Sequence, residues 1–314
     1  CHNFTALNDT DVKFNVSGWS NYSIDDLGYF PLYDCGIISS PGEYRLTKNL
    51  LDPDGCFLIN SNNVVLDCFG YAIRYATFFS GVGIETVTGM ENILIKNCSL
   101  NATSLRFSSH GITFNQPNNV TVLDSNISVA NPTSDAIRVY GGNDLNLSNF
   151  NFTGLNIYSN TYPLIFYASS SNLSNISIVD STIDSDQFLG NLIEFNLDSN
   201  SSIFNVLIEN NNLTTDSLTP GSSGMSGIKF DSNGVGIAVE DVRILNNIIN
   251  STGDFDSIGI YLSDEYGINY SEITIDSNYV NMLDGKSIQL GSNQTSINSL
   301  GNFEGVNITG NNLN

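Results

Sequence analysis

Residues 92–100 read Asn92-Ile-Leu-Ile-Lys-Asn-Cys-Ser-Leu100, and this pattern decides the fold. Ile93 and Ile95 are apolar and two residues apart, a polar corner follows them, and Leu100 resumes the alternation beyond the corner. Alternation with a period of two is typical of a β-strand, and Asn in a short polar segment is typical of a tight bend. The stretch therefore predicts two short strands that meet at a corner.

The same pattern recurs along most of the chain. Successive copies start 29, 27, 25, 31, 30, 36, 31 and 33 residues apart. A spacing that drifts this much suits a solenoid whose coils carry loops of different length, and it does not suit a helical repeat with a fixed unit. The copies are Val64-Val65-Leu66, Ile93-Leu94-Ile95, Val120-Thr121-Val122, Leu145-Asn146-Leu147, Ile176-Ser177-Ile178, Val206-Leu207-Ile208, Val242-Arg243-Ile244, Ile273-Thr274-Ile275 and Val306-Asn307-Ile308.

A second block, with Ile at a fixed point, precedes each copy after the first. Three short strands per turn can bury their inward faces only if the turns stack. We therefore predict an all-β fold, a right-handed parallel β-helix (solenoid) of about nine to ten turns over residues 35–314, with minimal helix. Residues 1–34 lack the repeat and are expected to form an N-terminal extension, either a cap or an inter-subunit arm. The isoleucines expected to stack are Ile84, Ile112, Ile137, Ile165, Ile193, Ile228, Ile260 and Ile288.

A small residue, usually Asn or Asp, follows each later copy at the corner. Asn tolerates the left-handed backbone that a tight corner needs, and stacked Asn side chains can donate and accept amide hydrogen bonds along the axis. We expect both features at these positions. The corner residues are Asn97, Asp124, Asn149, Asp180, Asn210, Asn246, Ser277 and Gly310.

The composition excludes several classes of partner. The chain has 10 Lys and Arg against 32 Asp and Glu, which gives a formal net charge of −22. Nucleic acid and anionic membrane surfaces are met by clustered basic residues, so neither is an expected partner. No apolar run is long enough to span a bilayer. The start at Cys1, without Met, suggests a processed exported chain, in which Cys1 either carries a lipid anchor or follows ordinary signal cleavage.

Potential N-glycosylation sites point to an extracellular or cell-surface location. The sequence contains eighteen Asn-x-Ser/Thr triplets, whereas its composition would give roughly nine by chance. The alternative explanation is structural: a repeat rich in Asn, Ser and Thr produces such triplets for reasons of packing and not for glycosylation. Asn97 lies in the corner beside Cys98 and is expected to remain bare. The predicted glycan sites are Asn3, Asn8, Asn15, Asn21, Asn101, Asn119, Asn126, Asn146, Asn151, Asn172, Asn175, Asn200, Asn212, Asn250, Asn269, Asn293 and Asn307.

The first repeats resemble a known group of proteins. Residues 35–50, beginning Cys35-Gly-Ile-Ile-Ser-Ser-Pro-Gly-Glu-Tyr-Arg-Leu, together with residues 56–59, 63–70 and 92–98, resemble the start of extracellular NosD-like parallel β-helix proteins, which are abundant in archaea. The resemblance covers about residues 35–314, and its later repeats are generic to the architecture. It implies a fold and an exported surface role. It implies no activity, because β-helices carry enzymes, adhesins and structural repeats alike.

Five cysteines, all within residues 1–98, allow fifteen arrangements of two bridges and one free thiol. The register places Cys68 and Cys98 near the corner of two adjacent turns, within the distance of a disulfide. Cys35 and Cys56 flank the first strand and would close a short loop, which fits the same resemblance. Cys1 would then remain unpaired.

No complete catalytic set is found, so we expect no enzyme activity and no cofactor or metal. His110 faintly resembles the His-Gly element of polygalacturonases, but the paired Asp and Arg-x-Lys elements are absent, and it is interpreted as a loop residue before a strand. Arg74, Arg106 and Arg138 could share its face, and they are interpreted as solvated charges.

Two further groups could bind ligands. Asp52 with Asp54, and Asp254 with Asp256, could hold calcium, but neither pair forms a complete calcium loop and both are interpreted as turn residues. Aromatic residues in one turn could stack on sugar rings or pack inside the solenoid. That cluster is Tyr158, Tyr162, Phe166 and Tyr167.

The sequence therefore predicts a non-catalytic, heavily N-glycosylated structural protein of a cell surface. Its expected partners are copies of itself, assembled through the solenoid ends into a filament or lattice, and covalent N-glycans. A carbohydrate-binding adhesin is the alternative, and a polysaccharide lyase or hydrolase is the third hypothesis.

Overall fold

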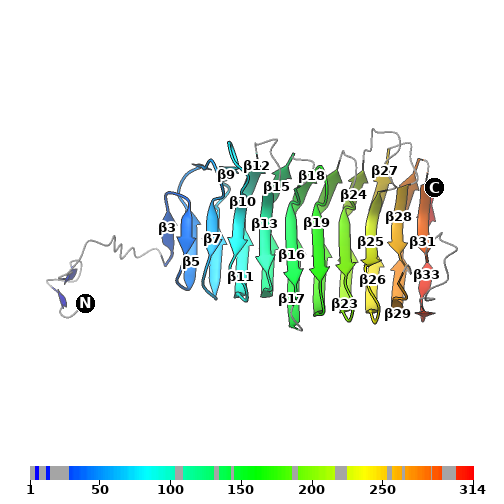
Figure 1. The fold of residues 1–314 in the computed structure, drawn as a ribbon. Helices are drawn as coiled ribbons and strands as arrows, with labels where there is room; N and C mark the ends of the chain where they lie inside the picture. The colour runs from blue at the N-terminus through cyan, green and yellow to red at the C-terminus, as the bar shows by residue number, and fades with distance from the viewer. Residues whose placement is uncertain are drawn as a thin grey trace.

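The computed structural model describes residues 4–6, 12–14, 28–102, 109–130, 134–142, 145–185, 190–215, 225–252, 257–263, 266–283, 285–291 and 302–314. These residues form strands and turns, with no helix among them. Figure 1 shows the strands of successive turns side by side along a rod, from the blue β3 to the red β33. Because all pairing between turns is parallel, the prediction of an all-β parallel β-helix is confirmed.

Each regular turn contributes one strand to each of three sheets, which we call sheets I, II and III in chain order. Sheet I contains β4 (Gly36–Ile38), β7 (Phe57–Ile59), β10 (Val82–Thr86), β13 (His110–Asn115), β16 (Ile137–Gly141), β19 (Leu164–Ala168), β22 (Ile193–Leu197), β25 (Ser226–Ser232), β28 (Ser257–Leu262) and β31 (Gly285–Leu290). Sheet II contains β3 (Phe30–Leu32), β5 (Gly42–Leu46), β8 (Val64–Asp67), β11 (Glu91–Lys96), β14 (Asn118–Leu123), β17 (Asn146–Thr153), β20 (Asn172–Val179), β23 (Ser202–Glu209), β26 (Ala238–Leu245), β29 (Asn269–Asp276), β32 (Asn302–Glu304) and β33 (Asn307–Thr309). Sheet III contains β6 (Leu50–Leu51), β9 (Ala72–Tyr75), β12 (Ser99–Ala102), β15 (Asn126–Val129), β18 (Asn156–Ser159), β21 (Thr182–Ser185), β24 (Asn212–Thr215), β27 (Ile248–Ser251), β30 (Tyr279–Met282) and β34 (Asn312–Leu313).

The N-terminal extension contributes to two different pairings. β3 lies within it and pairs in parallel with β5 at the start of sheet II. Two further strands, β1 (Phe4–Ala6) and β2 (Val12–Phe14), pair with each other in antiparallel orientation.

The core is a set of columns of equivalent apolar side chains. In sheet I one inward column runs Phe57, Ile84, Ile112, Ile137, Leu164, Ile193, Ile228, Ile260 and Ile288. The next column contains a run of stacked rings, in which Phe195 lies 4.9 Å from Phe166 and 4.5 Å from Phe230 between ring centroids. Full burial of such a side chain contributes roughly 1.5–3 kcal/mol, so these columns are the main source of stability.

The prediction is wrong for one member of the isoleucine column. Leu164, and not Ile165, lies between Ile137 and Ile193, while Ile165 pairs with Arg138 in the outward row. The run Leu164-Ile-Phe166 is apolar throughout, so alternation alone does not choose the inward positions. The column remains continuous because Leu164 fills the place.

The predicted repeat at Leu145-Asn146-Leu147 is also shifted. Phe150 is the residue that pairs with Val120 and Ile176. β17 is eight residues long and carries two inward apolar segments separated by Asn149, so the pattern occurs twice in one strand. The corner of this turn is therefore Gly154, with φ +65°, and the next inward residue is Ile157.

The other corners have the expected left-handed backbone. Their φ values lie between 46° and 62° at Asn97, Asp124, Asp180, Asn210, Asn246, Ser277 and Gly310. The main buried asparagine ladder, however, occupies the following position. Hydrogen bonds of 3.0 Å between side-chain amides join Asn211, Asn247, Asn278 and Asn311. A residue just past the corner points inward, so its amide can also bond the backbone of the previous turn.

Candidate functional site

The described sequon asparagines all lie on the outside of the rod. Twelve of the seventeen predicted sites fall within the described residues, and none of the twelve is buried. Among them Asn119, Asn146, Asn175 and Asn307 are exposed. The other five predicted sites, Asn3, Asn8, Asn15, Asn21 and Asn293, lie outside the described residues, as does Cys1.

The twelve sites are unevenly divided among the three sheets. Sheet II carries Asn119, Asn146, Asn151, Asn172, Asn175, Asn269 and Asn307, and sheet III carries Asn101, Asn126, Asn212 and Asn250. Asn200 lies in the turn between β22 and β23. Within the described part of the chain, no strand of sheet I contains a sequon asparagine. Two sides of the rod can therefore carry glycans while the outer face of sheet I has no attachment point on its strands.

Asn97 differs from the exposed sites. It is half-buried at the corner between β11 and β12, and its Nδ2 donates a hydrogen bond to Asp67 Oδ1 at 3.0 Å. Burial alone would raise the pKa of Asp67, but the hydrogen bonds from Asn97 and the Phe69 N–H, with the Lys96 charge, hold it below its usual value. The Asn97 amide is therefore engaged with an ionised carboxylate in a half-buried corner, whereas the Asn119 and Asn175 amides donate only to neighbouring asparagine side chains on the exposed surface.

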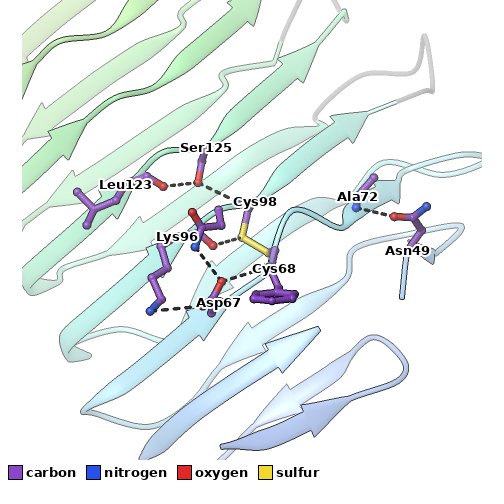
Figure 2. Close-up of a disulfide and its surroundings, with 10 residues drawn as sticks. Asn49, Asp67, Cys68, Ala72, Lys96, Cys98, Leu123 and Ser125 are labelled. Atoms are coloured by element: carbon purple, nitrogen blue, oxygen red, sulfur yellow. Dashed lines mark hydrogen bonds and ion pairs between the residues drawn. A yellow bond between two sulfur atoms is a disulfide. The ribbon is translucent and has the colours of Figure 1, made fainter. Parts of the chain in front are cut away.

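The two expected disulfides, Cys35–Cys56 and Cys68–Cys98, are present. Their Cα atoms lie 4.6 Å and 4.7 Å apart, and each bridge joins two adjacent turns. Cys35 and Cys56 lie directly before the paired strands β4 and β7 and connect these two turns, so they do not merely close a loop around one strand. Figure 2 shows the second bridge among Asp67, Lys96 and Ser125, where Ser125 Oγ accepts the Cys98 N–H at 3.1 Å.

The outer face of sheet I carries a cluster of ionisable and aromatic side chains. Two outward rows run along the rod axis on this face. The first, here called the buried row, is Thr113, Arg138, Ile165, Glu194 and Lys229. The second, here called the outer row, is Asn115, Tyr140, Tyr167, Asn196 and Asp231.

Asp135 and His110 are central to one end of this cluster. Asp135 forms an ion pair with Arg138, and its backbone N–H donates to His110 Nδ1 at 3.0 Å. Burial raises the pKa of Asp135 to about 6 although Arg138 opposes the shift. Burial, aided by the Arg138 charge, lowers the pKa of His110 to about 4, so the imidazole is neutral at pH 7.

This arrangement overturns two interpretations made from the sequence. His110 is the first residue of β13 and is buried, so it is not a loop residue. Arg138 is only 18% exposed and is paired with a carboxylate, so it is not a solvated charge. Arg74 is exposed on sheet III, and Arg106 lies outside the described residues.

Glu194 organises the other end of the cluster. Asn191 Nδ2 donates to its Oε2 at 2.6 Å, and Asn196 Nδ2 donates to its Oε1 at 3.3 Å. Burial raises the pKa of this carboxyl. Lys229 donates to Asp231 at 2.7 Å and lies 5.6 Å from the Tyr261 ring centroid. Asp135, Glu194 and Lys229 were not predicted from the sequence; equivalent positions on β22 and β25 were the available signal for Glu194 and Lys229, and Asp135 had none.

The predicted aromatic cluster is divided between faces. Phe166 lies in the core, Tyr158 is on the outer face of sheet III, and Tyr167 stacks on Tyr140 at 5.1 Å with an interplanar angle of 19°. Tyr162 is half-buried, and burial, with nearby Glu194, Asp135 and Asp231, raises its pKa to about 12.

Asp52 Oδ1 accepts the Asp54 N–H at 2.9 Å, as expected of a turn residue. Asp254 and Asp256 lie outside the described residues. In the part of the chain that the structure describes, no three His, Cys, Asp or Glu side chains form a group suited to a metal ion. That part also holds no helix able to cross a membrane.

Comparisons with known proteins leave the family open. No protein-family model matches the chain. No curated protein matches it either. Among solved structures, the Dettilon tailspike protein (gp208) is similar with a TM-score of 0.42 and 13% identity over 83% of this chain. The match spans 61% of the tailspike chain. A likeness this distant carries no functional argument.

Proposed function

We propose that this protein is a non-catalytic structural rod of a cell surface, N-glycosylated on two of its three faces. The observation that carries the proposal is the position of the twelve predicted glycan sites that the structure describes, which all lie on the outside and avoid the strands of sheet I. Sheet I also carries the outward asparagines Asn115 and Asn196, but neither of them begins an Asn-x-Ser/Thr triplet.

An extracellular location is part of the proposal. Disulfides persist in oxidising compartments, and two of them staple the first turns. The resemblance of residues 35–98 to exported NosD-like proteins points the same way. Assembly with copies of itself is also proposed. In a solenoid each turn contacts only its neighbours, so the pairing that joins two turns can also join two copies end to end.

Site-resolved mass spectrometry of glycopeptides from the native protein tests the glycosylation. The expected result is occupancy at sites on both sheets II and III, including Asn119, Asn175 and Asn307, with Asn97 bare. Unmodified peptides at all of these sites would overturn the proposal. Electron microscopy of the native material then separates filaments or lattices, which support assembly, from uniformly single rods, which contradict it.

A carbohydrate-binding adhesin is the second candidate. The observation that favours it is the stack of half-exposed Tyr140 and Tyr167 on the sequon-free face. An adhesin of this kind would bind carbohydrate from another cell or from its surroundings and would need no glycans of its own. Native protein that binds foreign polysaccharide as single rods with empty glycan sites would favour the adhesin, whereas native protein that carries glycans and assembles into filaments or lattices would favour the structural rod.

A further inference from the structure

We propose that the outer row of sheet I binds uncharged saccharide, and that its occupant is an N-glycan on sheet II or III of a neighbouring copy. The second part rests on the glycosylation proposed above, whereas the first part does not. The relevant residues are the outer row, Asn115, Tyr140, Tyr167, Asn196 and Asp231, with Arg138 behind it.

The outer row is a linear strip of side chains suited to sugar recognition. Its members occupy equivalent positions on β13, β16, β19, β22 and β25, so they follow one another at about 4.8 Å along the axis. Two are tyrosines, two are asparagines and one is an aspartate. Sugars are recognised by aromatic faces that pack on their C–H bonds and by amide or carboxylate groups that bond their hydroxyls.

The two tyrosines form a platform of stacked, half-exposed rings. Their rings stack at 5.1 Å, and both are half-exposed. The next members of the row, Asn115 and Asn196, have shorter side chains without a ring. The row places no second ring on the Asn196 side of Tyr167, and we place the sugar ring on that side, over Asn196.

Arg138 holds this platform in place. Its guanidinium donates to Tyr140 Oη at 2.9 Å and lies 5.3 Å and 5.8 Å from the ring centroids of Tyr140 and Tyr167. Asp135, almost fully buried, anchors the other side of the guanidinium. Rings fixed before a ligand arrives lose little entropy on binding, so the platform is preorganised.

A buried polar atom beside the row has no partner. Thr113 is 95% buried, since its exposure is 5%, and its Oγ1 makes no hydrogen bond to any described residue. It pairs with Arg138 in the buried row. Because this hydroxyl is enclosed beneath the surface, the contacts to a saccharide come from the outer row and not from Thr113.

The charges of the face favour an uncharged ligand. Arg138 is neutralised by Asp135 and Lys229 by Asp231, so neither cation remains to attract an anionic polymer. Glu194 adds a further carboxyl beside them. A polyuronide would meet net negative potential here, whereas a neutral hexose or N-acetylhexosamine would not.

The rod itself offers a ligand of this chemistry. Asn119, Asn146, Asn172, Asn175 and Asn212 lie on β14, β17, β20 and β24, which belong to the same turns as the outer row. A copy alongside would bring these glycans to the strip at high local concentration, which raises the occupancy of a weak site. Sheet I carries no glycan attachment point on its described strands, so the strip is left accessible.

The experiment measures saccharide binding to the full chain produced without glycans. The probes are glycopeptides from exhaustive proteolysis of the native protein, the same peptides made synthetically without sugar, a neutral glucan hexaose and a polyuronide hexamer. The variants are Tyr140→Ala and Tyr167→Ala. Tyr279→Ala is the matched control, because Tyr279 points outward on sheet III at 38% exposure. Thermal unfolding of each variant confirms that it is folded.

We expect glycopeptides and hexaose to bind and the bare peptides not to bind. Tyr140→Ala and Tyr167→Ala should each weaken binding at least tenfold, while Tyr279→Ala changes it less than twofold. Equal loss in Tyr279→Ala, preference for the polyuronide, or no binding by any probe would overturn the saccharide site. Binding of the hexaose but not the glycopeptides would overturn the neighbouring glycan as occupant. If native peptides carry no glycan, the proposed function fails, and the hexaose result still decides the saccharide site.

Discussion

Asn247 donates two hydrogen bonds to the same side-chain oxygen of Asn278. Its backbone N–H and its Nδ2 reach Asn278 Oδ1 at 2.9 Å and 3.0 Å, and the same Nδ2 also donates to Ile208 O at 2.9 Å. Asn247 Oδ1 in turn accepts both equivalent bonds from Asn211. The ladder thus satisfies polar groups inside a core that is otherwise apolar.

Asn247→Ala should therefore be strongly destabilising. It removes the acceptor of Asn211 and leaves buried amide groups without partners, at about 1–3 kcal/mol for each. We expect a total loss of roughly 3 kcal/mol or more in denaturant unfolding. Asn156→Ala, at an exposed asparagine of β18, is the control and should cost less than about 0.5 kcal/mol. Similar losses in both variants would show that the ladder contributes little.

Gly111→Ala tests the close packing of successive turns. A Cβ at this position would lie 2.3 Å from Ala136 O and 2.7 Å from Ile127 Cγ2, whereas one at Gly36 would meet nothing within 4 Å. Overpacking of this kind costs about 1–3 kcal/mol. Thermal unfolding should show a lower Tm for Gly111→Ala and an unchanged Tm for Gly36→Ala. Equal Tm values for both variants would contradict the packing described.

Replacement of Cys68 and Cys98 by Ser should loosen the first turns only. The bridge joins adjacent turns of the rod, and its loss is expected to cost about 2–4 kcal/mol. Amide hydrogen exchange should accelerate in β8, β9, β11 and β12 and remain unchanged in β26 and β29. Uniform acceleration along the chain would indicate one cooperative unit in place of turns that contact only their neighbours.

The Asp135 and His110 pair gives a pH prediction. The pKa of Asp135 is raised to about 6, so between about pH 4 and 6 the folded state holds a proton that the unfolded state lacks, and this contribution to stability falls as pH rises. The pKa of His110 is lowered to about 4, so its contribution rises with pH up to about 6.5. The two contributions oppose each other in the native protein.

Replacing either residue should reveal how the other one makes stability depend on pH. Relative to the unmodified protein, His110→Asn should lose stability and Asp135→Asn should gain stability as pH rises from 4.5 to 6, by up to about 1.4 kcal/mol per pH unit. Urea unfolding at several pH values measures both slopes. Arg138, Tyr140, Tyr162, Tyr167 and Glu194 also face this region, and they are common to all three proteins. Parallel slopes in the three proteins would contradict the assigned shifts.

Much of the fold follows from the sequence because the periodicity is strong. The polar corners, the three strands per turn and seven of the eight expected isoleucines are in the places that alternation indicates. The errors occur where alternation is ambiguous. Leu164-Ile165-Phe166 is apolar throughout, and β17 contains the apolar pattern twice, so the register there depends on pairing with neighbouring turns.

The cluster on sheet I was less predictable for a different reason. Asp135, Glu194 and Lys229 are about thirty or more residues apart, and no local motif connects them. The register brings Glu194 of β22 and Lys229 of β25 into one row with Arg138 of β16, and Asp135, just before β16, joins them through its ion pair with Arg138. Their burial, which raises the pKa of Asp135 and Glu194, depends on tertiary packing and is not visible in any short segment.

A density map of the native protein by electron cryomicroscopy tests the account most directly. We predict sugar density branching from asparagines of sheets II and III, such as Asn119, Asn175 and Asn212, with none on the strands of sheet I. The map should also show Ile137, Leu164 and Ile193 as one continuous column beneath that face. A fully native map without branching density at those asparagines, or with glycans attached to sheet I, would contradict it.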